Sequence, residues 1–169
     1  MKTLKPLLIL LISLALLSCG NDDDNNPGSR STEVIDVFIN GSTTALDFTA
    51  TINASDNPLP ASSGFTNQFI IDATDRSNNS FLFRFPPSNT SPFTFSTPTS
   101  ETLSGPISQR LFVQGIDFDD AAANSITINY TAFGPNANDD LKIDFSGTYF
   151  EVGDPSPKTI SCFIDIDRD

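Results

Sequence analysis

The chain has 169 residues and a formal net charge of −12, with nine basic residues against 21 acidic ones. This charge argues against nucleic acid as a partner, because the phosphate backbone would be repelled. Histidine and tryptophan are both absent, which excludes histidine-dependent catalysis and histidine metal sites and leaves 15 phenylalanines to supply much of the core.

The first 18 residues predict a secretory signal peptide. Lys2 and Lys5 give a basic start, an apolar run of about a dozen residues follows over 6–17, and Ser18 is the small residue before the expected cleavage point. The run is too short for a membrane-spanning helix, which needs about 20 residues. We therefore expect residues 1–18 to direct export and to be removed.

The end of this segment, Leu16-Leu17-Ser18-Cys19, resembles the cleavage motif of bacterial lipoproteins. The resemblance implies that Cys19 becomes the mature N-terminus and carries acyl chains, and that the lipid bilayer is a partner. Two or more chains give stable anchoring, whereas a single chain binds marginally. Without Lys2 and Lys5, seven basic residues face 21 acidic ones, so the mature charge is 7 − 21 = −14.

Three consecutive acidic residues, Asp22, Asp23 and Asp24, follow the cysteine closely. This run resembles the export signal of surface lipoproteins of the Bacteroidota, in particular flavobacteria. The resemblance implies an outer-membrane lipoprotein on the cell surface, with a periplasm-facing position as the alternative. Residues 19–32 are too polar to bury a core, so the segment is also expected to act as a flexible tether.

From Glu33 onward the pattern favours short strands. Asn40-Gly41 is a strong hairpin signal. Residues 54–64, 74–79, 101–105, 134–140 and 154–157 are expected to be loops or turns, and 115–124 is the one segment that suits a helical turn. Alternating or β-branched runs predict strands over 34–39, 46–53, 65–73, 81–85, 107–114, 126–131, 141–149 and 160–166, with an edge strand at 93–95.

Eight or nine short strands without a convincing helix predict an all-β domain over 33–169. Clean alternation favours an antiparallel two-sheet β-sandwich, and a lipocalin-like β-barrel is the alternative. Residues 125–130 and 141–149, followed by a last strand that ends near Asp169, look like the closing hairpin of small uncharacterised flavobacterial lipoproteins. That resemblance supports the fold class and implies no activity.

Candidate metal ligands cluster between 115 and 124. Asp117, Asp119 and Asp120 place carboxylates at spacings that suit calcium. The glycine and the terminal glutamate of an EF-hand loop are missing, so a solvated acidic turn is the favoured interpretation.

Aromatic residues and the remaining cysteine are assigned mainly to the core. Tyr130, Tyr149 and Phe150 are the candidates for a partly exposed binding face. Cys162 alternates in phase with neighbouring isoleucines, which favours a buried small hydrophobe over a nucleophile, and no disulfide is expected. Phenylalanines at 81, 83, 85, 93 and 95 suit a core better than a sugar-stacking platform.

These features favour a non-catalytic lipoprotein that binds something, or serves a structural role, in the cell envelope. A glycan, a nutrient or an envelope protein is the partner class, by analogy alone, and no cofactor is expected. The alternatives are a barrel that carries a small apolar ligand and, less favoured, a carboxylate-based hydrolase.

Overall fold

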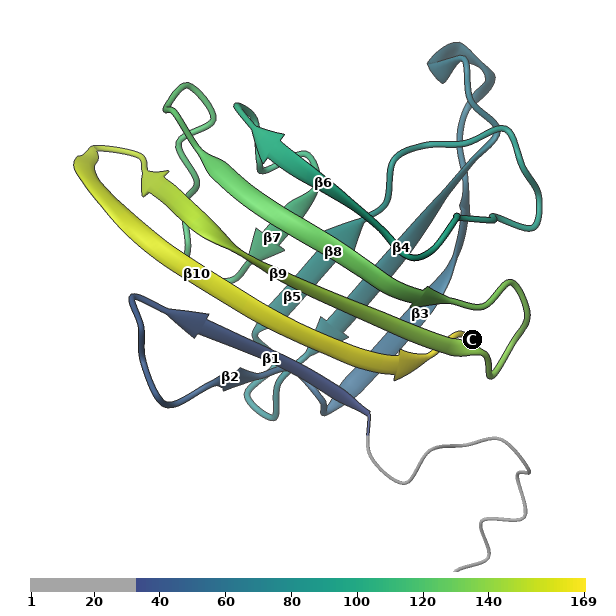
Figure 1. The fold of residues 1–169 in the computed structure, drawn as a ribbon, viewed down its shortest axis with the longest axis horizontal. Helices are drawn as coiled ribbons and strands as arrows, with labels where there is room; N and C mark the ends of the chain where they lie inside the picture. Colours follow the sequence, from purple (N-terminus) through teal and green to yellow (C-terminus); the bar gives the residue numbers. More distant parts are fainter. Residues whose placement is uncertain (1–32) are drawn as a thin grey trace, which may run out of the picture.

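Two antiparallel sheets packed face to face form a β-sandwich in the computed structural model, which describes residues 33–169 (Figure 1). The sandwich prediction is confirmed. The barrel alternative is wrong, because no strand pairing joins the two sheets. The expected signal 1–18 and tether 19–32, with Cys19 and Asp22 to Asp24, lie outside the described residues.

The larger sheet has six strands in the order β2-β1-β10-β9-β8-β6, and the smaller has four in the order β3-β4-β5-β7. A 3-10 turn, η1, spans Ala61–Ser63. Within residues 33–169, no helix is long and apolar enough to cross a membrane. The strands are β1 Val34–Ile39, β2 Leu46–Asp47, β3 Thr51–Pro58, β4 Asn67–Thr74, β5 Ser80–Arg84, β6 Thr99–Ser104, β7 Leu111–Val113, β8 Ser125–Phe133, β9 Asp140–Glu151 and β10 Asp154–Asp167.

The hairpin of β9 and β10 runs the length of the large sheet. Its pairing extends from Asp140 opposite Asp167 to Glu151 opposite Asp154. Strand β1 adds to the other side of β10, with Val34 opposite Asp165, so the chain enters the sandwich beside its own C-terminal end. In Figure 1 this entry and the β9–β10 turn lie at opposite ends of the molecule.

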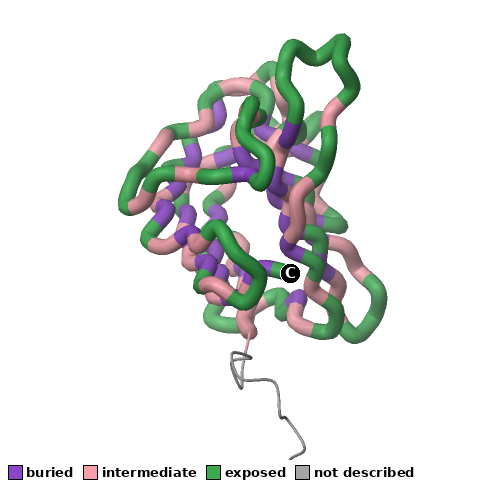
Figure 2. Tube along the Cα trace, turned by 90° about the vertical axis from the view of Figure 1, so that its right-hand side faces the viewer, coloured by how far each residue is buried: buried purple, intermediate pink, exposed green. Residues whose placement is uncertain are grey.

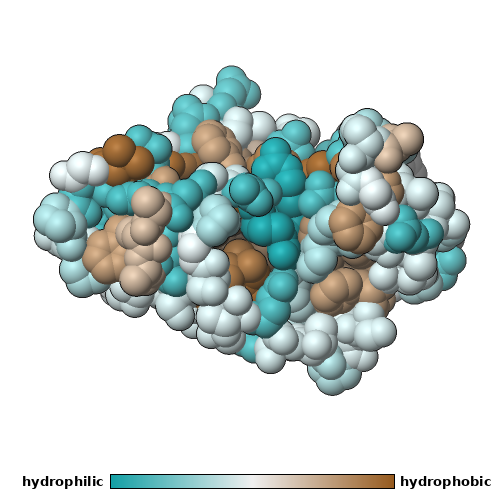
Figure 3. Space-filling model, turned by 90° about the horizontal axis from the view of Figure 1, so that it is seen from above, coloured by the Kyte–Doolittle hydropathy of each residue, from teal (hydrophilic) through white to brown (hydrophobic). Residues whose placement is uncertain are grey.

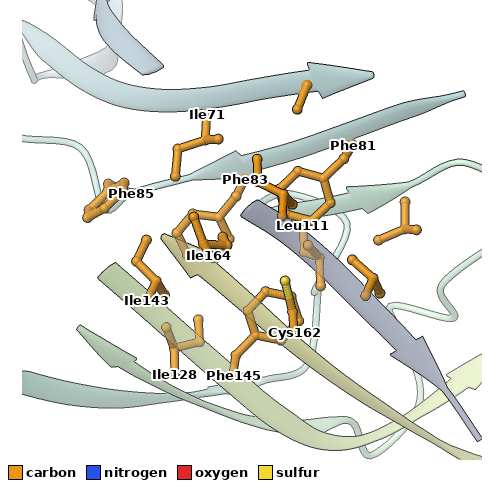
Figure 4. Close-up of a cluster of buried hydrophobic side chains, with 14 of the residues drawn as sticks. Ile71, Phe81, Phe83, Phe85, Leu111, Ile128, Ile143, Phe145, Cys162 and Ile164 are labelled. Carbon is orange, nitrogen blue, oxygen red and sulfur yellow. The ribbon is translucent and has the colours of Figure 1, made fainter. Parts of the chain in front are cut away.

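The interior between the sheets is filled by side chains from the inward-facing positions of the strands. Phe81, Phe83 and Phe85 are fully buried, which confirms their assignment to the core. Phe83 stacks on Phe145 of the opposite sheet with ring centroids 6.1 Å apart, as the close-up in Figure 4 shows. Cys162 is also buried and free, as expected, and burial raises its thiol pKa. Figure 2, turned by 90° from Figure 1, shows the buried positions along the strands and mostly exposed positions in the loops.

A buried arginine near the C-terminus joins the two sheets at the end where the chain enters. Arg168 forms an ion pair with Asp56 of β3 at 2.7 Å and donates to the carbonyl oxygen of Phe93 at 3.0 Å. Its guanidinium also lies 4.8 Å from the ring centre of Phe69. The charge is thus paired, hydrogen-bonded and placed over an aromatic ring, which offsets the cost of its burial.

Several sequence-based boundaries are wrong. Strand β3 continues through 54–58, where a loop was expected, and β6 forms at 99–104 across an expected turn. The expected strand 107–114 is reduced to β7, residues 93–95 form no strand, and 115–124 contains no helical turn.

Close contact between β8 and β9 requires a glycine at position 147. A Cβ atom there would lie 2.1 Å from the backbone oxygen of Ser125 and 2.6 Å from the Cα of Ile126. Gly147→Ala should therefore lower the free energy of unfolding by about 1–3 kcal/mol or more, measured by chemical denaturation. Ser146→Ala, at the exposed neighbouring position, is the control and should change it by less than about 0.5 kcal/mol. Equal stability of the two variants would contradict the tight strand approach.

Candidate functional site

An open hollow lies at the end of the sandwich opposite to the chain entry. Its volume is about 480 Å³, within the range of about 300–1,000 Å³ that is common for small-molecule sites. It lies between the loop that precedes β8 and the turn that joins β9 to β10. Its lining residues are Asp119, Ala122, Ala123, Phe150, Gly153, Asp154 and Pro155.

Phe150, on the outer face of β9, lines this hollow. The buried Asn124 fixes the preceding loop against it, because its side-chain oxygen accepts the Phe150 N–H at 3.0 Å. The Asn124 amide group donates to the carbonyl oxygens of Asp119 at 2.7 Å and Gly105 at 3.1 Å. The backbone N–H of Asp119 then donates to the Phe150 carbonyl at 2.8 Å. One side chain therefore positions one wall of the hollow.

The other wall follows the β9–β10 turn. There Gly153 adopts a φ of +80°, a backbone conformation that residues other than glycine rarely adopt. The Asp154 carboxylate accepts the Ser156 N–H at 3.0 Å and lies 3.3 Å from the Lys158 ammonium group. The Ser156 N–H, followed by Lys158, lowers the pKa of this carboxyl below its ordinary value. Asp154 is thus held in its charged form at the rim.

A charged cluster lies directly behind the turn. Lys158 contacts Glu151 at 2.6 Å, and Glu151 also accepts the Tyr149 hydroxyl at 3.3 Å. Hydrogen bonding to Glu151 raises the pKa of the Lys158 ammonium group, so the lysine keeps its charge across the neutral range. The cluster closes this end of the sandwich and holds Lys158 next to the hollow.

The three aspartates considered for calcium do not converge on one point. Oδ1 of Asp119 accepts the Ala121 N–H at 3.0 Å, and the Asp120 carboxylate accepts the backbone N–H and the hydroxyl of Ser108. Asp117 contributes its carbonyl oxygen to the Val152 N–H at 2.9 Å. Across residues 33–169, no group of three or more acidic or cysteine side chains is arranged to hold a metal ion.

The expectation that Tyr130 and Tyr149 are partly exposed is wrong, since they are 1% and 0% exposed. Their positions alternate in phase with buried Ile128 and Phe145, a signal that was available in the sequence. Each hydroxyl reaches a carboxylate at the edge of the core, Tyr130 at Glu101 and Tyr149 at Glu151. Phe150, the third candidate, lines the hollow. Sequence reasoning missed Ala122, Ala123, Gly153, Asp154 and Pro155, which carry no chemical motif.

Two further hollows lie on the outside of the large sheet near β6 and the β8–β9 loop. Both include Thr131, and both are open to solvent. Figure 3 views the molecule from above, relative to Figure 1. On the side that it shows, apolar residues form separate patches divided by hydrophilic ones. Each of the three hollows includes an aromatic residue and at least one aspartate, and the hollow at Phe150 is the one whose wall is held by the hydrogen bonds of Asn124.

Comparisons with protein-family models, curated proteins and solved structures gave no match.

The two buried tyrosines should titrate abnormally. Burial, followed by the charge of Glu151, raises the pKa of Tyr149 to about 12, and burial followed by hydrogen bonding to Glu101 raises that of Tyr130 further. The folded protein should form little tyrosinate at pH 10.0, the ordinary midpoint, whereas the denatured chain should be half ionised there. Since the folded pKa values are raised, stability should be intact below this pH and fall toward pH 12. Ultraviolet difference spectroscopy measures this directly, and normal titration of either tyrosine in the folded state would contradict its burial.

Proposed function

We propose that this chain is a non-catalytic binding module held by acylated Cys19 in the outer membrane and displayed on the cell surface. The sequence motif around Cys19 and the run Asp22 to Asp24 support the anchoring and the location. The sandwich is the domain that the tether presents, and its ligand belongs to the glycan or nutrient class.

The observation that carries this proposal is the position of the hollow relative to the tether. The tether joins the fold at Glu33, where Val34 pairs with Asp165, whereas Asp154 lines the hollow. Asp165 lies eleven positions after Asp154 in β10, which corresponds to roughly 35 Å of extended strand. An anchored molecule would therefore hold the hollow away from the bilayer and open to ligands from outside.

Two features argue for this role over the alternatives. The two sheets do not close into the barrel that a carrier of apolar ligands would use, and packed aromatic and aliphatic side chains fill the interior between them. A hydrolase that uses two carboxylates needs an acid with a raised pKa, and the pKa of Asp154 in the hollow is lowered. Binding without catalysis needs neither a cavity in the core nor a tuned acid.

Anchoring can be tested at the cysteine itself. Cys19→Ala should abolish incorporation of labelled fatty acid and release the protein from the membrane fraction, because the acyl chains supply the attachment. Cys162→Ala is the matched control and should keep the label, since that thiol is buried in the fold. Membrane retention of the unlabelled Cys19 variant would contradict lipid anchoring.

Surface display is tested separately at the acidic run. Replacement of Asp22, Asp23 and Asp24 by Ala should keep acylation and membrane attachment but remove accessibility to protease added to intact cells. The control replaces Asn21, Asn25 and Asn26 by Ala, which leaves the charges in place and should preserve display. If the aspartate variant remains accessible, the run is only a tether. If the unaltered protein is already protected, the module faces the periplasm.

A further inference from the structure

We propose that the hollow at Phe150 binds an organic ammonium ion, with its apolar substituents against the ring and its charge toward the carboxylates. This inference rests on the proposed function only in assigning ligand binding to this end of the sandwich. The anchoring and surface display of the protein do not determine the chemical class of its ligand, and the inference specifies that class.

Charge around the hollow is strongly unbalanced toward the negative. The loop before β8 brings three aspartates to this end, and the β9–β10 hairpin adds two more acidic residues. Lys158 is the ammonium group that the structure places among them. A cation is therefore favoured here and an anion is repelled. Of these five carboxylates, those of Asp119 and Asp154 line the hollow, whereas Asp117, Asp120 and Glu151 lie outside its lining.

Lys158 neutralises only two of these carboxylates, those of Glu151 and Asp154. Its ammonium group is already held at 2.6 Å by Glu151 and at 3.3 Å by Asp154, behind the turn. Oδ1 of Asp119 accepts a backbone N–H, while its Oδ2 has no hydrogen-bond partner within residues 33–169. Asp119 lies on the opposite wall from the lysine and is partly exposed, so it offers a charge to a ligand that enters between the two walls.

Shape and surface chemistry favour an organic cation over a bare metal ion. The apolar part of the lining consists of Ala122, Ala123, Pro155 and the ring of Phe150. A metal ion needs several oxygen ligands directed at one point, and the aspartates of this loop do not provide them. An alkylammonium ion places methyl groups on such surfaces, and an aromatic face attracts its diffuse positive charge.

A neutral sugar would use this hollow less completely. It could stack on Phe150 and donate hydroxyl groups to Asp119 and Asp154, but it would gain nothing from the excess negative charge. Charge complementarity therefore decides between the two ligand classes, and the experiment is designed around it.

The test compares choline with 3,3-dimethylbutan-1-ol, which has the same shape and no charge. Binding to the full mature lipoprotein in detergent is measured by saturation-transfer NMR and by titration calorimetry. Choline should bind with a dissociation constant in the millimolar range, since one partly buried ring and a partly screened charge give weak attraction. The affinity should fall with added salt, and the neutral isostere should bind at least about tenfold more weakly.

Variants locate the site. Asp119→Asn keeps an acceptor for the Ala121 N–H but removes the charge, and Phe150→Ala removes the ring; each should weaken choline binding by about threefold or more. Phe163→Ala is the matched control, because Phe163 is an exposed phenylalanine paired with Asp36 and Asp144 outside the hollow. Its loss should leave binding unchanged.

Three outcomes would overturn the inference: equal binding of choline and the isostere, preference for a neutral disaccharide or for Ca²⁺ over choline, and loss of binding in the Phe163 variant alone. None of these bears on acylation or protease accessibility. The ligand class can therefore fail while the anchored module stands, and the reverse also holds.

Discussion

Burial of phenylalanine between the two sheets is the interaction on which the rest of the structure depends. The described fold has no disulfide and no α-helix to cover a sheet, so each sheet must bury its apolar face against the other. Phe81 and Phe83 of β5 are fully buried in this interior, and Phe83 stacks on Phe145 from the large sheet. Both sheets contribute large rings and smaller aliphatic side chains, and together these fill the interior.

The parts of this fold that follow from alternation were predictable. Strand β1 matches its expected bounds, β5 matches to within one residue, and the sequence placed Phe81, Phe83 and Cys162 on buried faces. A period of two reports which side of a strand is apolar, and burial between sheets depends directly on that. The same period marks Tyr130 and Tyr149 as buried; weighing their polar hydroxyls above their positions caused the error.

The parts that depend on distant partners were not predictable. Asp56 looked like a loop residue, yet the fold pairs it with Arg168, 112 positions along the chain, and β3 continues through it. Strand β6 has no apolar alternation because it is an edge strand, and its Glu101 is held by Tyr130 of β8 and by Arg110, which lies just before β7. The hollow has the same origin: a loop, a turn and one strand position become a site only when Asn124 joins them.

The same long-range pairing shapes where the negative charge remains. Arg168 and Arg110 are used at contacts between the sheets, against Asp56 and Glu101, and neither lies at the end that carries the hollow. Lys158 is the one basic residue of the described chain that is paired at that end, and it is shared between two carboxylates. At the end that carries the hollow, the acidic residues therefore outnumber this one paired lysine. Because fixed charges act most strongly over a few ångströms, the carboxylates of Asp119 and Asp154 affect a ligand in the hollow more than the net charge of the chain does.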